Sequence, residues 1–188
     1  MIGRTGALIA ANVIALLAAG DAAAQLVQSS YTDVDLDQCT VVTSDDFGST
    51  WACPGLKGMP VMVAEGDLRM SVSYGLTSTT EKAATQTLPP FNRLGDTIEW
   101  RVSNAEGHYK PFATILRFLT QRESGEKEGQ VLVVTKLMPG ATCHVAYVDA
   151  LANPDANELA RRVADEKARD FDCEKEPEFV GKFEAWER

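Results

Sequence analysis

Residues 61–74 read VMVAEGDLRMSVSY, and this stretch decides the fold class of the chain. In its second half, apolar side chains occupy every other position, at Leu68, Met70, Val72 and Tyr74. This period of two is typical of a strand with one buried face. A shorter apolar run, residues 61–64, precedes it, and Gly66 lies at the tight position between the two runs. The stretch therefore predicts an antiparallel β-hairpin.

Similar runs continue on both sides of this hairpin. They occupy residues 31–43, 50–53, 97–103, 112–119, 131–137 and 143–148. Trp51 and Trp100 lie in two of these runs, and we expect both to anchor the core. Apart from Arg117, residues 112–119 are apolar on both sides, which favours a strand covered on both faces, with a helix as the alternative. Short turns separate most runs, so we predict an antiparallel β-sheet, sandwich or small barrel.

Two segments of the chain break this pattern. Residues 25–30 are expected to be a flexible leader of the mature chain. Residues 77–90 are polar and end in two prolines, which predicts a loop of uncommon length.

In the run 31–43, Asp33, Asp35 and Asp37 alternate with apolar residues, so we expect these carboxylates on the solvent-exposed face of a strand.

One helix is predicted after the strands, over about residues 154–172. Asn153 suits the N-cap, and Pro154 suits the first helical position. Small and apolar side chains recur along one face, at Ala160, Val163, Ala164, Ala168 and Phe171. Asp165 and Arg169 are an opposite-charge pair four residues apart, which suits the exposed face. The fold class predicted is thus mainly β (α+β), with one C-terminal α-helix.

The chain contains four cysteines, Cys39, Cys53, Cys143 and Cys173. An even number of cysteines in an exported chain is typical of a disulfide framework. Three pairings can be written, and Cys39–Cys53 with Cys143–Cys173 is favoured because each bond is then local. In the chain-entropy model, each such bond contributes about 3–4 kcal/mol to the free energy of unfolding. The sequence contains no Cys-x-x-Cys motif and no zinc spacing, so a redox or metal role is disfavoured.

Length and composition describe an ordinary globular protein of 188 residues. The chain carries 18 basic and 27 acidic residues, a formal net charge of −9. This balance disfavours nucleic acid as a partner, because phosphate recognition needs clustered Lys and Arg. It disfavours electrostatic docking on anionic lipid for the same reason.

The first 24 residues have the features of a secretory signal peptide. Arg4 supplies the positive start, residues 7–19 form the apolar run, and Ala22-Ala23-Ala24 fits a cleavage site before Gln25. The apolar run is shorter than the roughly 20 residues that span a bilayer, so we expect no stable membrane insertion. The mature chain is then a single β-rich domain over residues 25–176, with an acidic, aromatic tail over 177–188.

Few residues suggest chemistry. The aspartates at 33, 35 and 37 resemble the start of a calcium-binding EF-hand loop, but the glycine and glutamate that the loop needs are absent. His108 lies in an exposed turn, and Glu65 and Asp67 are a close pair of carboxylates. No phosphate-binding, dinucleotide-binding or metalloprotease motif appears. We therefore predict no catalytic residue, no cofactor and no metal.

The tail offers the clearest candidate for a contact with a partner. Phe179, Phe183 and Trp186 recur at helical spacing within an acidic segment. They can dock on the body of the domain, bind a partner or stay disordered. Docking on the body is favoured, because three exposed aromatic side chains are an apolar liability.

Residues 31–39 (YTDVDLDQC), 51–55 (WACPG) and 63–67 (VAEGD) resemble short exported proteins of Gram-negative bacteria. So do the helix and the cysteine that follows it, Cys173. The function of those proteins is itself not established. The resemblance therefore implies a periplasmic location and the cysteine pairs, and it carries no catalytic residue.

Two functions follow from these observations as hypotheses. The first is a non-enzymatic periplasmic domain with a binding, inhibitory or envelope-accessory role, whose partner is an envelope protein or ligand. The second is a hydrolase of envelope sugar or peptide that uses carboxylates or His108. A pocket with converging polar groups would favour the enzyme, and an exposed apolar surface would favour the binding domain.

Overall fold

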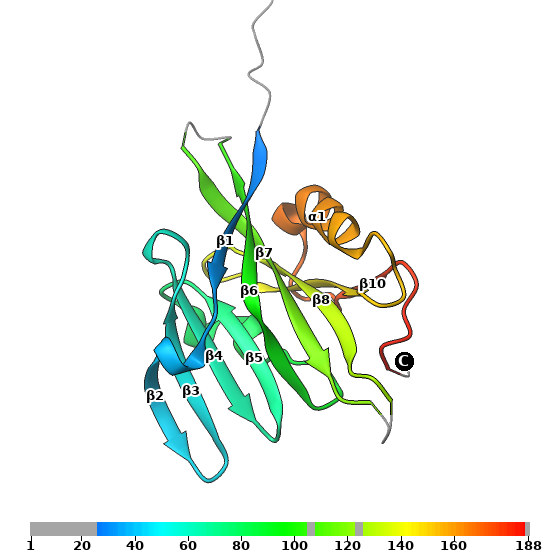
Figure 1. The fold of residues 1–188 in the computed structure, drawn as a ribbon. Coiled ribbons are helices and arrows are strands. Elements are labelled where there is room, and N and C mark those ends of the chain that lie inside the picture. The colour runs from blue at the N-terminus through cyan, green and yellow to red at the C-terminus, as the bar shows by residue number, and fades with distance from the viewer. Residues whose placement is uncertain (1–25, 105–107, 123–125, 187–188) are drawn as a thin grey trace, which may run out of the picture.

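The computed structural model describes residues 26–104, 108–122 and 126–186 (Figure 1). The signal peptide predicted for residues 1–24, and its cleavage site before Gln25, lie outside these ranges. Within them, the chain forms ten strands in two sheets and one α-helix, α1 (Ala156–Lys167).

The larger sheet has the spatial order β1-β6-β7-β8-β9-β10. Its strands are β1 (Val27–Asp33), β6 (Asn92–Ser103), β7 (Lys110–Thr120), β8 (Gly129–Lys136), β9 (Cys143–Asp149) and β10 (Glu178–Val180). The smaller sheet has the order β2-β3-β4-β5. Its strands are β2 (Thr40–Asp45), β3 (Gly48–Pro54), β4 (Pro60–Gly66) and β5 (Arg69–Tyr74).

The smaller sheet is inserted in the chain between two neighbouring strands of the larger one. β1 pairs antiparallel with β6, with Val27 opposite Ser103 and Asp33 opposite Thr97. Strands β2 to β5 lie between them in sequence and form an antiparallel meander. β10 pairs parallel with β9, since α1 intervenes as the crossover between them.

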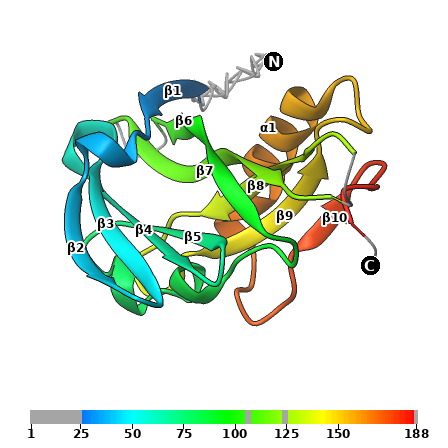
Figure 2. The ribbon, with the colours of Figure 1, turned by 60° about the horizontal axis from the view of Figure 1, so that its bottom comes forward.

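Three layers result from this arrangement. Helix α1 and the smaller sheet cover opposite faces of the larger sheet (Figure 2). The core between the two sheets contains Trp100, which is fully buried and packs edge-on against Tyr74. Its indole Nε1 donates a hydrogen bond to Thr32 Oγ1 at 2.8 Å, so its polar atom is satisfied. Trp51 packs against this core and is partly buried.

The second core lies between the larger sheet and α1. The helix buries the small side chains of Ala160 and Ala164 together with Val163, as its apolar stripe predicts. They meet Val134 and Val145 of β8 and β9. Strands β7, β8 and β9 are therefore buried on both faces, which explains why residues 112–119 are apolar on both sides.

Two ion pairs join α1 to β6. The Arg101 guanidinium binds both carboxylate oxygens of Asp165, at 2.9 and 2.6 Å. Arg161 binds both oxygens of Glu99, at 2.6 and 3.1 Å, and these hydrogen bonds raise the pKa of the Arg161 guanidinium. The expected pair between Asp165 and Arg169 is wrong, because the Asp165 carboxylate turns inward to the buried Arg101.

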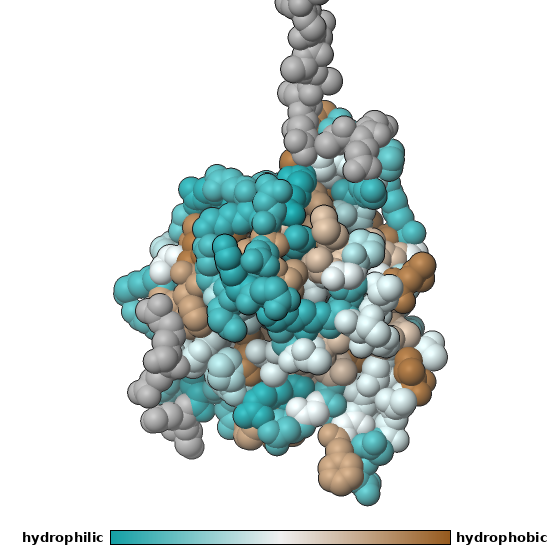
Figure 3. Space-filling view, turned by 180° about the vertical axis from the view of Figure 1, so that it is seen from behind, coloured by the Kyte–Doolittle hydropathy of each residue, from teal (hydrophilic) through white to brown (hydrophobic). Residues whose placement is uncertain are grey.

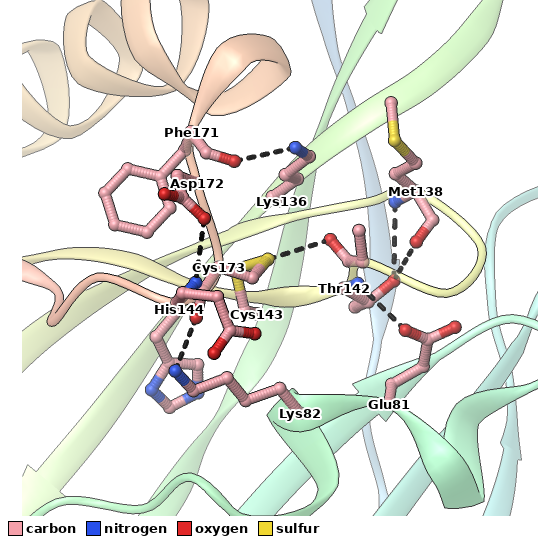
Figure 4. Close-up of a disulfide and its surroundings, with 12 residues drawn as sticks. Glu81, Lys82, Lys136, Met138, Thr142, Cys143, His144, Phe171, Asp172 and Cys173 are labelled. Atoms are coloured by element: carbon pink, nitrogen blue, oxygen red, sulfur yellow. Dashed lines mark hydrogen bonds between the residues drawn. A yellow bond between two sulfur atoms is a disulfide. The ribbon is translucent and has the colours of Figure 1, made fainter.

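Both disulfides form in the pairing that locality favours. Cys39–Cys53 joins the start of the smaller sheet to β3, and Cys143–Cys173 joins β9 to the segment after α1 (Figure 4). The mainly β fold, the C-terminal helix and the two bonds are therefore confirmed.

Other local expectations need correction. The strand expected over residues 31–43 is interrupted: β1 ends at Asp33, and the Asp35 side chain accepts a hydrogen bond from the Asp37 N–H at a 3-10 turn. Residues 27–30, expected to be flexible, belong to β1 because β6 supplies their hydrogen-bonding partners. The helix is shorter than residues 154–172: α1 ends at Lys167 and a 3-10 turn, Ala168–Asp170, follows it.

The tight turn of the β4–β5 hairpin also differs from the expectation. Gly66 pairs with Arg69 as the last residue of β4, so the two turn residues are Asp67 (φ 50°) and Leu68 (φ 59°). Two successive left-handed residues are typical of a type I′ turn, which favours glycine at its second position. A leucine there is strained, because its Cβ crowds the backbone in this conformation.

We expect Leu68→Gly to raise the free energy of unfolding by about 0.5–1 kcal/mol, because it relieves this strain. Urea unfolding of the oxidised protein measures the change. Leu151→Gly is the matched control: Leu151 is similarly exposed but is not among the residues with positive φ, so its replacement should not stabilise the protein. Stabilisation by both variants, or by neither, would contradict the strain argument.

Candidate ligand-binding groove

An apolar groove lies where connecting segments and the ends of β4, β5 and β7 converge. Its walls are formed by residues 56–60, 74–77, 110–111 and 137–139, together with Thr142. Its volume is about 630 Å³, within the range of small-molecule sites. We call this feature the groove.

Large apolar side chains line the groove and remain in contact with solvent. Leu76 is 93% exposed and Met138 is 46% exposed. The face of the molecule in Figure 3 is mostly hydrophilic, and hydrophobic side chains reach it only in separate areas. Exposed leucine and methionine side chains at the mouth of a concave surface are typical of interaction sites, and methionine adapts readily to the shape of a ligand.

The segments that form the groove are held by specific backbone contacts. Gly75, at φ 89°, adopts a conformation that favours glycine, and its N–H donates to the Pro60 carbonyl at 2.8 Å. This bond fixes the segment 74–77 against the start of β4. Lys57, also in the left-handed region, donates from Nζ to the Tyr109 carbonyl at 3.5 Å. These two hydrogen bonds join the segment 56–60 to residues 74–77 and to the residue before β7, Tyr109.

A buried carboxylate, Glu81, holds two further segments of the groove. It lies between two 3-10 turns, Ser78–Thr80 and Lys82–Thr85, in the stretch expected to be a long loop. Its oxygens accept hydrogen bonds from Thr77 Oγ1 at 2.5 Å, from the Gly140 N–H at 2.7 Å and from the Thr142 N–H at 2.9 Å. Figure 4 shows Glu81 pointing at Thr142. Glu81 thus connects the segment 74–77 to the β8–β9 connection.

The ionised form of Glu81 is favoured by these contacts. Burial on its own would raise the pKa of the carboxyl, but the hydrogen bonds from Thr77, Thr142 and Gly140 outweigh it and lower the pKa below its ordinary value of 4.5. Stability that comes from Glu81 is therefore fully present above pH 4.5. It is lost as the pH falls through the lowered pKa.

His144 responds to acid over a different range. It is fully buried, its Nδ1 lies 3.0 Å from the Tyr147 hydroxyl, and burial lowers its pKa to about 3. The imidazole is neutral in the folded chain and takes up a proton on unfolding below its ordinary pKa of 6.5. The protein therefore loses stability from this group between about pH 6.5 and pH 3. His144 is therefore a buried, hydrogen-bonded histidine with a structural role.

The aromatic residues of the tail dock on the body of the domain. Phe179 belongs to β10, Phe183 is buried, and both contact Trp186 in a cluster of edge-on rings that includes Tyr147 of β9. Phe179 remains 39% exposed. Asn153, expected to cap the helix, instead holds this tail: its amide accepts from the Lys182 N–H and donates to the Lys182 carbonyl. Binding of a partner by these aromatic residues stays a prediction.

The residues suggested for hydrolytic chemistry are not brought together at the groove. Glu65 accepts a hydrogen bond from the Leu68 N–H, and Asp67 pairs with Arg69, so both serve the β4–β5 turn. His108 is exposed and lies beside Lys110, outside the groove.

Sequence reasoning did not identify the groove, because its walls were predicted as separate turns, loops and strand ends. The signal available was the density of Gly, Pro, Leu and Met in residues 54–60 and 137–140. In one sequence, such composition marks turns and does not show that two turns converge.

Comparison with known proteins adds no family: no protein-family model, no curated protein and no solved structure matches this chain. In the described ranges, no group of three or more His, Cys, Asp or Glu side chains is placed to hold a metal ion. None of the helices in those ranges has both the length and the apolar character needed to cross a bilayer.

We expect Glu81→Gln to lower the free energy of unfolding by about 2 kcal/mol at pH 7, because two backbone N–H groups and a hydroxyl lose an ionised acceptor. The difference from the parent protein should shrink below pH 4.5, as Glu81 takes up a proton. Denaturant unfolding between pH 7 and pH 3 measures both quantities.

The acid response of His144 is common to both proteins and cancels in that difference. Glu174→Gln, at an exposed position, is the matched control and should change stability by less than about 0.5 kcal/mol. A pH-independent difference for Glu81→Gln would show that the carboxylate is not the stabilising group.

Proposed function

We propose that this chain is a periplasmic binding domain without catalysis of its own, and that the groove holds its ligand. The observation that carries the proposal is the exposed apolar lining, above all Leu76 and Met138, on a concave surface. Covering these side chains removes apolar area from water, which favours association. The second core and the disulfides hold the surrounding scaffold in place, so little conformational entropy is lost when a ligand binds.

Export to the periplasm is part of the same proposal. Both disulfides support it, because such bonds persist in oxidising compartments. The features of a signal peptide in residues 1–24 and the resemblance to exported Gram-negative proteins point to the same location. The excess of acidic residues over the whole chain favours solubility.

Binding in the groove is tested with N-phenyl-1-naphthylamine, a neutral apolar dye that fluoresces when shielded from water. We expect the purified mature protein to bind the dye saturably. Leu76→Asp should weaken binding about tenfold, because it removes apolar contact area and places a charge beside the dye.

Phe47→Asp is the matched control for this experiment. Phe47 is 88% exposed, lies in the β2–β3 turn and does not line the groove. Dye binding that is absent, or that weakens equally in both variants, would refute the groove as the binding site.

If the protein is exported, the protein recovered from the periplasm of a Gram-negative host should have lost its leader and contain both disulfides. Its intact mass should correspond to a chain beginning at Gln25, with all four cysteines protected from alkylation until a reductant is added. Free thiols in the denatured, unreduced protein, or a retained leader, would contradict the proposed location.

A further inference from the structure

A second hollow, of about 350 Å³, adjoins the groove, and we call it the basic cleft. Lys136 lines it from the end of β8, Arg169 from the turn after α1, and His108 and Lys110 from the region where β7 begins. Residues 110–111 and 137–139 line both hollows. Any molecule that fills both must therefore pass along this shared wall.

Cationic groups are concentrated in the basic cleft against the trend of the whole chain. Its described lining includes two lysines and an arginine but one carboxylate, Asp170, in a protein with a net charge of −9. A concave surface with this excess of one sign raises the local concentration of an anion.

Lys136 is the most informative of these cations. It is only 6% exposed, and its Nζ donates one hydrogen bond, to the Phe171 carbonyl at 2.8 Å (Figure 4). An ammonium group has three N–H donors, and none of the carboxylates in the described residues forms an ion pair with this one. A buried cation with a single neutral partner is costly, and an anion in the cleft would offset that cost.

Arg169 provides a second donor set that is only partly used. Its guanidinium stacks 3.4 Å from the centroid of the Phe112 ring, which fixes its plane, and Nη1 donates to the Asp165 carbonyl at 3.3 Å. Nη2 is buried and has no hydrogen-bond partner in the described part of the chain. Guanidinium groups fixed in this way are suited to carboxylates, which accept from two N–H groups at once.

We infer that the groove and the basic cleft together hold one amphiphilic anion, a long-chain fatty acid, with its alkyl chain in the groove and its carboxylate in the cleft. The inference rests on the proposed binding function and names the chemical class of the ligand. It is carried by the shared wall of the two hollows and by the contrast between their linings.

An alkyl chain suits the groove better than a peptide does. Recognition of an extended peptide relies on backbone hydrogen bonds to a sheet edge. The groove is walled by connecting segments and strand ends, and its uncharged polar side chains are two threonines and Tyr74, which is almost fully buried. Leucine, methionine and proline side chains make the contacts that an unbranched hydrocarbon chain needs, without directional partners.

The test compares three molecules with the same twelve-carbon chain, below their micelle concentrations: dodecanoate, dodecyltrimethylammonium and dodecyl maltoside. Each is titrated as a competitor of the neutral dye on the disulfide-bonded mature protein. We expect dodecanoate to bind about tenfold or more tightly than the cationic molecule. Shortening the fatty acid to octanoate should weaken binding by up to about fourfold for each methylene removed.

Lys136→Met distinguishes the contribution of the basic cleft to binding from that of the groove. This variant keeps an unbranched apolar stem and removes the charge. It should abolish the preference for dodecanoate and leave dye binding unchanged. Lys182→Met, which removes an exposed charge outside both hollows, is the matched control and should keep the preference. If Lys136→Met does not fold, Arg169→Met, which removes the guanidinium of the basic cleft and does not line the groove, makes the same test.

The outcomes distinguish the two proposals. Saturable dye binding with equal affinity for the three molecules would overturn the fatty-acid inference and leave the binding groove intact. Failure of the dye and of all three molecules to bind would overturn both. Displacement of the dye by an acidic apolar peptide, with none by dodecanoate, would overturn the fatty acid in favour of a peptide site.

Discussion

Strands β7, β8 and β9 are apolar on both faces, and the rest of the structure is arranged to keep water from both. A sheet of this kind cannot be stable alone, because each face exposes valine, leucine and isoleucine side chains that need a covering layer. The inserted meander β2–β5 covers one face, and α1 covers the other. Both disulfides strengthen the covering elements: one lies at the start of the smaller sheet, and the other fastens the segment after α1 to β9.

Polar groups that this arrangement buries are mostly matched with partners. Glu99 and Arg101 lie on the face of β6 that α1 covers, and the helix presents Arg161 and Asp165 to them. Removal of one member of such a buried network leaves a charge without its partner, which is the costly outcome. Against this background Lys136 is conspicuous, since it is equally buried and has a carbonyl as its hydrogen-bonding partner. The contrast between a matched network on β6 and an unmatched cation on β8 is the physical reason to regard the latter as part of a site.

The sequence was sufficient for features set by local periodicity and insufficient for those set by pairing between distant segments. Alternation identified β5 and β6, and the alanine stripe identified α1, because burial of one face selects residues at a fixed period. The first half of β1, residues 27–30, was missed because it is largely polar and is a strand only through its pairing with β6. The pairing register of β4 and β5 likewise places Leu68 in the turn with a positive φ, although a leucine disfavours that conformation. The groove and the basic cleft were not predictable, since they arise where turns far apart in sequence meet.

The groove forms at a place where the covering layers give way to connecting segments. Connections between strands lie at the ends of a sheet, where neither a helix nor a second sheet can cover apolar side chains fully. Connecting segments are ordinarily flexible, but here Glu81 joins the segment 74–77 to the β8–β9 connection. Cys143, which forms one of the disulfides, begins β9 just beyond this connection. Lys82, next to Glu81, also binds the Cys173 carbonyl. One short segment thus links the groove to the disulfide that fastens α1, so stiffness from the cross-linked layer extends to the apolar surface. A surface held open in this way can keep leucine and methionine exposed without collapsing, which is the property that a preformed binding site requires.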